Sequence, residues 1–153
     1  MSNVLSGLRP TIVWQYFEEI CQIPRPSKKE EKILKYLTDF AGKHGLSFTQ
    51  DRLGNLVIRK GATSGYENRK TVVLQSHVDM VCEKNADVEH DFDNDPILPY
   101  IADDWVRARG TTLGADDGIG MAVQLALLAS ADIPHGPLEC LFTVDEETGL
   151  TGA

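Results

Sequence analysis

Apolar side chains at helical spacing indicate two helices in the first third of the chain. Between positions 11 and 21 they recur at i, i+3, i+4 and i+7, and Pro10 stands where a helix can begin. After a proline-rich break at 23–26, Ser27 and Glu30 have the spacing of a capping box. Gly45 is placed to end the second helix, whose apolar stripe consists of Ile33, Leu34, Leu37, Phe40 and Ala41.

Short runs rich in β-branched and aromatic residues indicate two hairpins. Residues 46–50 and 55–59 are strand-like and are joined by a turn at 51–54. Residues 97–101 and 105–107 flank Asp103 and Asp104 in the same way, which predicts a second, smaller hairpin.

Two further apolar runs with a helix between them indicate the fold class. Residues 71–75 and 138–144 lack alternation, which is typical of strands buried on both faces, and we expect them at the centre of a sheet. Residues 118–129 carry apolar side chains on every side, which predicts a well-buried helix. Strand, helix and strand form a βαβ unit. We predict an α/β fold with a mixed, largely parallel sheet flanked by helices and with an exposed edge or face.

Composition and charge narrow the class of protein. With 42% hydrophobic and 25% charged residues the chain is typical of globular proteins, and it has no apolar run of membrane-spanning length. Three widely spaced cysteines favour a reducing, cytoplasmic location without disulfides. The net charge of −8 argues against nucleic acid as a partner. Residues 1–70 hold 12 basic and 7 acidic residues, whereas residues 71–153 hold 3 and 16, so the acidic half either forms a surface or builds a site.

Acidic clusters follow both of the predicted central strands. His77 and Asp79 come after the first strand, and Glu146 and Glu147 follow the second. The glycine-rich loop 114–118 enters the helix between them. Because ligands of open α/β sheets bind beyond the carboxyl ends of the strands, these segments are expected to meet. A histidine with carboxylates from separate segments suits zinc or a similar divalent ion.

Spacing assigns chemistry within these clusters, although each cluster also has a simpler interpretation. Two positions apart on an extended segment, His77 can bind metal while Asp79 accepts its other ring N–H; the alternative is a strand cap beside a solvated acid. Of Glu146 and Glu147, one can bind metal while the other takes a proton from water, or both can belong to an exposed loop. Asp116 and Asp117 lie between Gly114 and Gly118, which lets the backbone bring a carboxylate close to a cation. The alternative is a glycine-rich helix entry with Asp117 near the N-terminus, where the helix dipole favours an acid.

Three segments of the chain resemble a known family. Residues 73–81 (VLQSHVDMV), 111–122 (TTLGADDGIGMA) and 143–149 (TVDEETG) are similar to the three metal-site segments of the co-catalytic di-zinc peptidases, which include carboxypeptidases, tripeptidases and deacylases, and they occur in the same order. Most members have a lysine shortly after the bridging aspartate. The sequence Gly-Ile-Gly at 118–120, with residues 67–70 and 107–110, resembles instead the aminoacylhistidine dipeptidase (Xaa-His dipeptidase) branch.

The resemblance implies a role for each site residue. His77 would bind one zinc ion, Glu147 the other, and Asp116 would bridge both. Asp79 would orient His77, and Glu146 would be the general base that activates the bridging water for attack on a peptide carbonyl. A cis peptide between Asp116 and Asp117 is also expected.

The resemblance further implies that the chain is only part of a complete enzyme. The family needs an aspartate and a histidine beyond the paired glutamates and a lid and dimerisation domain, so we expect residues 1–153 to be the N-terminal portion of the catalytic domain of a homodimeric dipeptidase. Two zinc ions, or cobalt or manganese, would be cofactors of the full-length protein, with small peptides as substrates. The chain alone would bind metal weakly and be inactive. A tripeptidase, an amino-acid deacylase and a non-catalytic metal-binding module are the alternatives.

Overall fold

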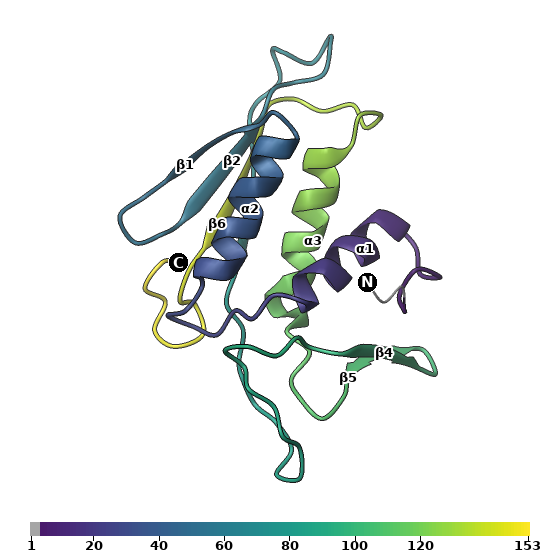
Figure 1. Ribbon diagram of the computed structural model, residues 1–153. Helices are drawn as coiled ribbons and strands as arrows, with labels where there is room; N and C mark the ends of the chain where they lie inside the picture. The colour runs from purple at the N-terminus through teal and green to yellow at the C-terminus, as the bar shows by residue number, and fades with distance from the viewer. Residues whose placement is uncertain (1–3) are drawn as a thin grey trace.

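The structure is a computed structural model that describes residues 4–153 (Figure 1). Its helices are α1 (Thr11–Cys21), α2 (Glu31–Lys43) and α3 (Ala115–Ala129). Its strands are β1 (Ser47–Gln50), β2 (Leu56–Lys60), β3 (Val72–His77), β4 (Pro99–Ala102), β5 (Trp105–Ala108) and β6 (Leu138–Thr143). Both predicted hairpins are present, as the antiparallel pairs β1–β2 and β4–β5. Within the described part of the chain, no helix combines the length and apolarity needed to cross a membrane.

The main sheet has four strands in the order β1-β2-β6-β3, which confirms the predicted mixed α/β sheet flanked by helices. Strands β3 and β6 are parallel, in a register that pairs Val72 with Leu138 and His77 with Thr143. The share of parallel pairing is smaller than expected, because the returning hairpin strand β2 pairs antiparallel with both β1 and β6. Because β3 and β6 are parallel neighbours, their carboxyl ends lie side by side.

The core lies on one face of this sheet. Figure 1 shows α2 and α3 across that face, with α1 packed against α3. The buried sheet residues alternate with half-buried ones such as Val57 and Leu141, which point to the opposite face. The side chains that β2 and β6 bury against the helices are Leu56, Ile58, Cys140 and Phe142.

The prediction that β3 is a central strand buried on both faces is wrong. In the described residues β3 pairs only with β6 and forms the edge of the sheet. Val72 is 48% exposed and Val73 is 57% exposed, and only the carboxyl end of the strand is buried. An apolar run is typical of a strand in a sheet, but it does not say which strands lie beside it. The sheet does have an exposed edge, as expected, but this strand, which was expected at the centre, forms it.

The predicted capping box at the start of α2 is also wrong. No side chain caps this helix, which begins at Glu31. The Ser27 hydroxyl instead donates to Asp79 Oδ2 at 2.6 Å. Glu30 Oε1 accepts the backbone N–H groups of Lys28 and Asp145, at 2.9 and 3.0 Å. Both polar side chains thus form tertiary contacts, which sequence spacing does not reveal.

The helix predicted at 118–129 is confirmed as the regular part of α3. Before it, Asp116 and Asp117 have non-helical backbone angles, and the peptide bond between them is cis, as the family resemblance implied. Val123 is 39% exposed, so the expectation of burial on every side holds only in part. Packing against α1 and β3 covers the other sides of α3, where Met121 and Leu125 are fully buried.

Truncating Leu125 tests the packing of α3 against the sheet. We expect Leu125→Ala to lower the free energy of unfolding by about 2–5 kcal/mol, because it leaves a cavity at a fully buried position. The measurement is urea unfolding of the protein that carries this chain. Val123→Ala on the same helix is the matched control and should cost less than about 1 kcal/mol. Equal costs for the two variants would contradict the described packing.

Candidate active site

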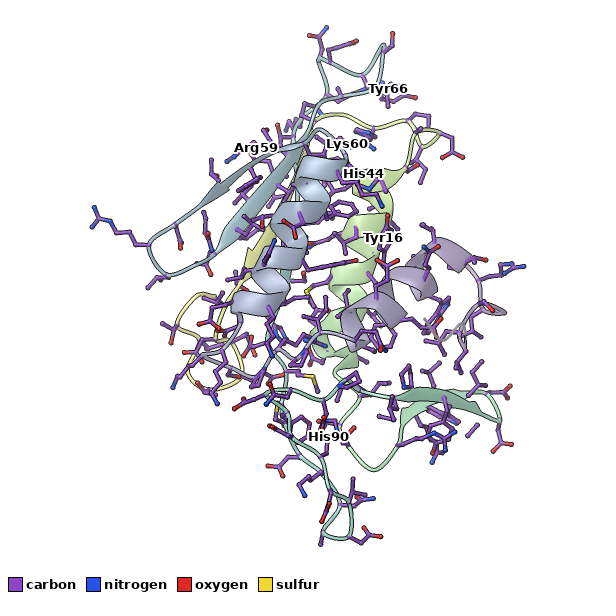
Figure 2. All side chains as sticks on the ribbon, viewed as in Figure 1. Tyr16, His44, Arg59, Lys60, Tyr66 and His90 are labelled. Carbon is purple, nitrogen blue, oxygen red and sulfur yellow. The ribbon has the colours of Figure 1, made fainter. Side chains whose placement is uncertain are left out.

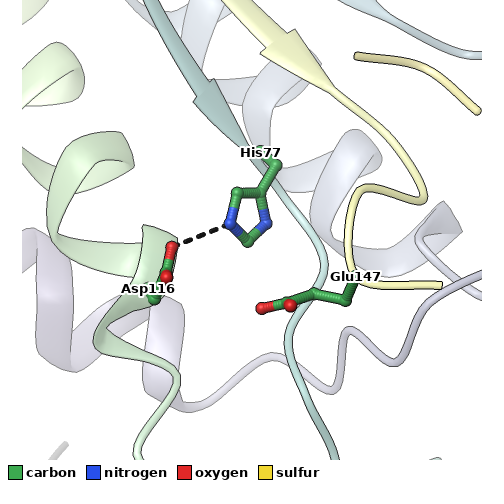
Figure 3. A group of neighbouring side chains, drawn as sticks. All are labelled: His77, Asp116 and Glu147. Carbon is green, nitrogen blue, oxygen red and sulfur yellow. Dashed lines mark hydrogen bonds and ion pairs between the residues drawn. The ribbon is translucent and has the colours of Figure 1, made fainter. Parts of the chain in front are cut away.

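Parallel pairing of β3 and β6 brings the predicted site segments together. His77 is the last residue of β3, and Thr143, its register partner, ends β6, so residues 77–79 and 145–147 leave the same edge of the sheet. The first turn of α3, which carries Asp116, lies at this edge as well (Figure 3).

Three potential ligand atoms converge at this edge. One atom each from His77, Asp116 and Glu147 lies within 4.8 Å of the other two. His77 Nε2 is 2.9 Å from Asp116 Oδ1, and Figure 3 shows the Glu147 carboxylate directed toward the same space. His77 is buried, Glu147 is half-buried and Asp116 is exposed, so the group opens to solvent on one side. One imidazole and two carboxylates are a donor set that zinc and similar divalent ions accept.

The electrostatics of this group favour a bound cation. Burial is the main cause that raises the pKa of Glu147, and repulsion from Asp116, Glu146 and Asp79 adds to it, with only His77 acting in the opposite direction. A cation between Glu147 and Asp116 would offset this repulsion. The residues present therefore fit a divalent metal ion.

Asp79 is a fully buried carboxylate with four hydrogen-bonding neighbours. It accepts the Ser27 hydroxyl and the backbone N–H groups of Glu146 and Glu147, the latter two at 3.1 Å, and its Oδ1 lies 3.3 Å from His77 Nδ1. Burial opposes its charge, but these hydrogen bonds outweigh burial and hold the pKa of Asp79 well below its usual range. Asp79 thus stays ionised and ties the loop after β6 to the end of β3.

The surroundings of His77 determine which ring nitrogen can bind a metal. Nδ1 faces two groups that can only accept, the Asp79 carboxylate and the Asp79 carbonyl oxygen at 3.1 Å, so Nδ1 carries the proton. Burial lowers the pKa of His77, but the hydrogen bonds with Asp79 and Asp116 outweigh it and raise that pKa to about 9. A metal ion at Nε2 would replace the proton that now faces Asp116.

Glu146 lies beside this group and is not part of it. Its backbone N–H donates to Asp79 Oδ1, and its side chain is half-buried. The group at this edge whose potential ligand atoms lie within 4.8 Å of one another consists of His77, Asp116 and Glu147. The two adjacent glutamates therefore differ in position: Glu147 belongs to the group of potential metal ligands, and Glu146 lies beside that group.

A second group of buried carboxylates, consisting of Glu30, Asp79 and Asp145, supports the loop after β6. Asp145 accepts the hydroxyls of Thr148 and Thr151, which lowers its pKa, and its own N–H donates to Glu30. These hydrogen bonds fix the turn that presents Glu146 and Glu147.

Sequence reasoning missed Arg25, which is 2% exposed. Its guanidinium donates to the carbonyl oxygens of Val78, Asp79 and Gly114, at 3.0, 2.8 and 2.6 Å. An arginine between two prolines, directly after an apolar helix, was the available signal, because a charged residue in such a place must find partners inside the fold.

Several known proteins are similar to this chain in sequence and in fold. Residues 73–153 match the family described as "Peptidase family M20/M25/M40". The chain is 55% identical, over 97% of its length, to the cytosol non-specific dipeptidase of Escherichia coli strain K12, and covers 31% of that protein. The aminoacylhistidine dipeptidase structure from Vibrio alginolyticus matches with a TM-score of 0.95 and 55% identity over 97% of this chain and 30% of that one. A Staphylococcus aureus tripeptidase matches with a TM-score of 0.73 and 28% identity, over 91% and 37%.

These matches confirm the resemblance drawn from the three sequence segments, including the aminoacylhistidine dipeptidase branch. The chain spans about a third of the length of these relatives. The matched family region covers more than half of the chain and contains all of the site residues from His77 to Glu147. The chain belongs to peptidase family M20/M25/M40.

Proposed function

We propose that this chain is the N-terminal portion of the catalytic domain of a metal-dependent dipeptidase that prefers Xaa-His dipeptides. The convergence of His77, Asp116 and Glu147 at the carboxyl ends of the parallel strands is the observation that carries the proposal. Two matched relatives named as dipeptidases support the substrate class, and one of them is named for aminoacylhistidine dipeptides.

The activity is assigned to a longer protein, because the chain spans only about a third of its relatives. The remaining length would supply the rest of the catalytic domain and a lid and dimerisation domain, and the whole would work in the cytoplasm as a homodimer. The name of the Escherichia coli relative, a cytosol dipeptidase, supports the location.

The metal ions of this proposal are two zinc ions, for which cobalt or manganese can substitute. His77 would hold one ion and Glu147 the other, and Asp116 would contribute to both. Zinc sites in proteins usually have three or more protein ligands, so two per ion from this chain imply weak or partial occupancy without the remainder of the protein. When bound, the metal polarises the scissile carbonyl and lowers the pKa of water at the site.

Glu146 is the proposed general base. Its carboxylate takes a proton from the attacking water and delivers that proton to the leaving amine nitrogen. Its backbone N–H is held by Asp79, the same carboxylate that faces His77 Nδ1, so one buried group sets both the base and a metal ligand. Asp79 orients the His77 ring and leaves Nε2 directed toward Asp116.

Glu146→Gln in the full-length protein tests the base. We expect kcat for dipeptides to fall by about 10²- to 10⁴-fold with the zinc content unchanged, because the amide keeps the shape of the side chain and cannot accept the proton. Glu139→Gln, which alters an ion pair with Arg59 on the sheet, is the control and should keep normal turnover. Unchanged kcat in Glu146→Gln would contradict the role of Glu146 as the base, whereas zinc binding without turnover in the unaltered protein would favour the non-catalytic metal-binding module.

Asp116→Asn tests the metal ligands. The amide removes the charge between the two proposed ions, so we expect the zinc content of the purified full-length protein to fall from two ions per chain to fewer than one. The measurement is elemental analysis after dialysis against a defined zinc concentration. Asp117→Asn is the matched neighbour, because Asp117 Oδ1 accepts the Gly120 N–H and an amide oxygen can do the same. Equal zinc contents in the two variants would contradict the assignment of Asp116.

A substrate panel tests the dipeptidase assignment against the other activities of the family. We expect the full-length protein to hydrolyse Xaa-His dipeptides with a higher kcat/KM than tripeptides or acyl-amino acids. The match to a tripeptidase makes the tripeptides the important comparison. A preference for tripeptides or acyl-amino acids would replace the substrate class and leave the hydrolytic chemistry in place.

A further inference from the structure

Arg25 connects two segments that carry proposed metal ligands. Its Nη1 donates to the carbonyl oxygens of Val78 and Asp79, directly after His77, and its Nη2 donates to the carbonyl oxygen of Gly114, two residues before Asp116. The planar guanidinium reaches both segments from one fixed position. Because Arg25 is 2% exposed, water does not compete for these bonds.

The first turn of α3 is shaped around this guanidinium. A Cβ atom at Gly114 would lie 2.5 Å from Arg25 Nη2, and one at Gly118 would lie 2.8 Å from the same atom. Gly114 also has φ +67°, in the left-handed region that favours glycine. The absence of side chains at these two positions lets Arg25 approach the backbone on either side of Asp116.

Neighbours of Arg25 in the chain contact the rest of the site. Pro26 forms a β-bridge with Met80, and the Ser27 hydroxyl donates to Asp79. Glu30 accepts the N–H of Asp145 in the turn that presents the paired glutamates. The short segment from Arg25 to Glu30 therefore contacts all three site segments, although it contributes no metal ligand itself.

We propose that Arg25 is a positioning residue, which sets the separation of His77 and Asp116 so that both can bind metal. The proposal rests on the proposed function, because it takes these two residues to be metal ligands. Removal of a group that holds metal ligands in place typically weakens metal binding by about 10- to 100-fold. A lysine keeps the charge at this position but lacks the fork that reaches the Val78, Asp79 and Gly114 carbonyls together.

Arg25→Lys in the full-length protein is the test, and Co²⁺ alone is the probe. The metal-free variant is titrated with Co²⁺, and binding is followed by the visible absorption of the ion at a temperature where circular dichroism shows a folded protein. We expect about tenfold or weaker binding than in the unaltered protein. With dipeptide substrate, the zinc concentration for half-maximal activity should rise to a similar extent, while KM stays the same and saturating zinc restores most of kcat.

Arg59→Lys is the matched control. Arg59 also joins two segments through its guanidinium, donating to Glu139 and Thr49. It lies on the sheet (Figure 2), and its partner Glu139 is near the start of β6, whereas the site follows the end of that strand. We expect unchanged Co²⁺ affinity in this variant. A merely structural role for Arg25 would lower the thermal midpoint of the metal-free protein and leave the metal affinity of the folded protein unchanged, which would overturn the proposal.

Gly118→Ala is a second variant, in case Arg25→Lys does not fold. The added methyl would lie 2.8 Å from Arg25 Nη2 and 3.1 Å from Phe17 Cε2, so the guanidinium end has to move without being removed. Alanine is also the better helix former. Weaker Co²⁺ binding despite this gain supports the proposal, and normal binding contradicts it. A protein that binds Co²⁺ with this dependence on Arg25 but cleaves no peptide would contradict the proposed function and support the positioning role. A zinc-dependent dipeptidase whose Arg25→Lys variant binds metal normally would support the proposed function and contradict the positioning role of Arg25.

Discussion

The buried carboxylate of Asp79 is the interaction on which the arrangement of the site depends. It accepts the backbone N–H groups of Glu146 and Glu147, accepts the Ser27 hydroxyl and lies against His77 Nδ1. A fully buried charge is stable only when its hydrogen bonds are made. Each of these bonds consequently fixes another segment: the turn after β6, the segment before α2 and the ring of the proposed metal ligand.

Topology explains why these segments can share one carboxylate. His77 and Asp116 are 39 positions apart, and the β4–β5 hairpin lies between them. The parallel pairing of β3 with β6 requires a crossover, and α3 provides it, so the beginning of α3 returns to the edge where both strands end. A site made from three distant segments thus follows from a single βαβ unit.

Local sequence patterns predicted the helices and the site segments, and they failed where contacts between distant residues determine the structure. Helical periodicity identified α1 and α2, and the three family-like segments contained every predicted site residue. The exposed edge position of β3 could not be predicted, because an apolar run does not reveal its neighbours in the sheet. Ser27 resembled a helix cap and instead binds Asp79, while Arg25 lies between two prolines, outside any helical or strand periodicity. Both residues act through contacts more than fifty positions away.

The uneven distribution of charge along the chain has two different consequences in the fold. Part of the acidic second half meets the basic first half: Lys29 pairs with Asp93 at 2.6 Å, and Arg25 binds the backbone beside Asp79. At the site this compensation stops, because within residues 4–153 no lysine or arginine forms an ion pair with Asp116 or Glu147. The first half therefore supplies cations that hold the acidic segments in place, and it supplies none to the converging carboxylates at which we propose a metal ion.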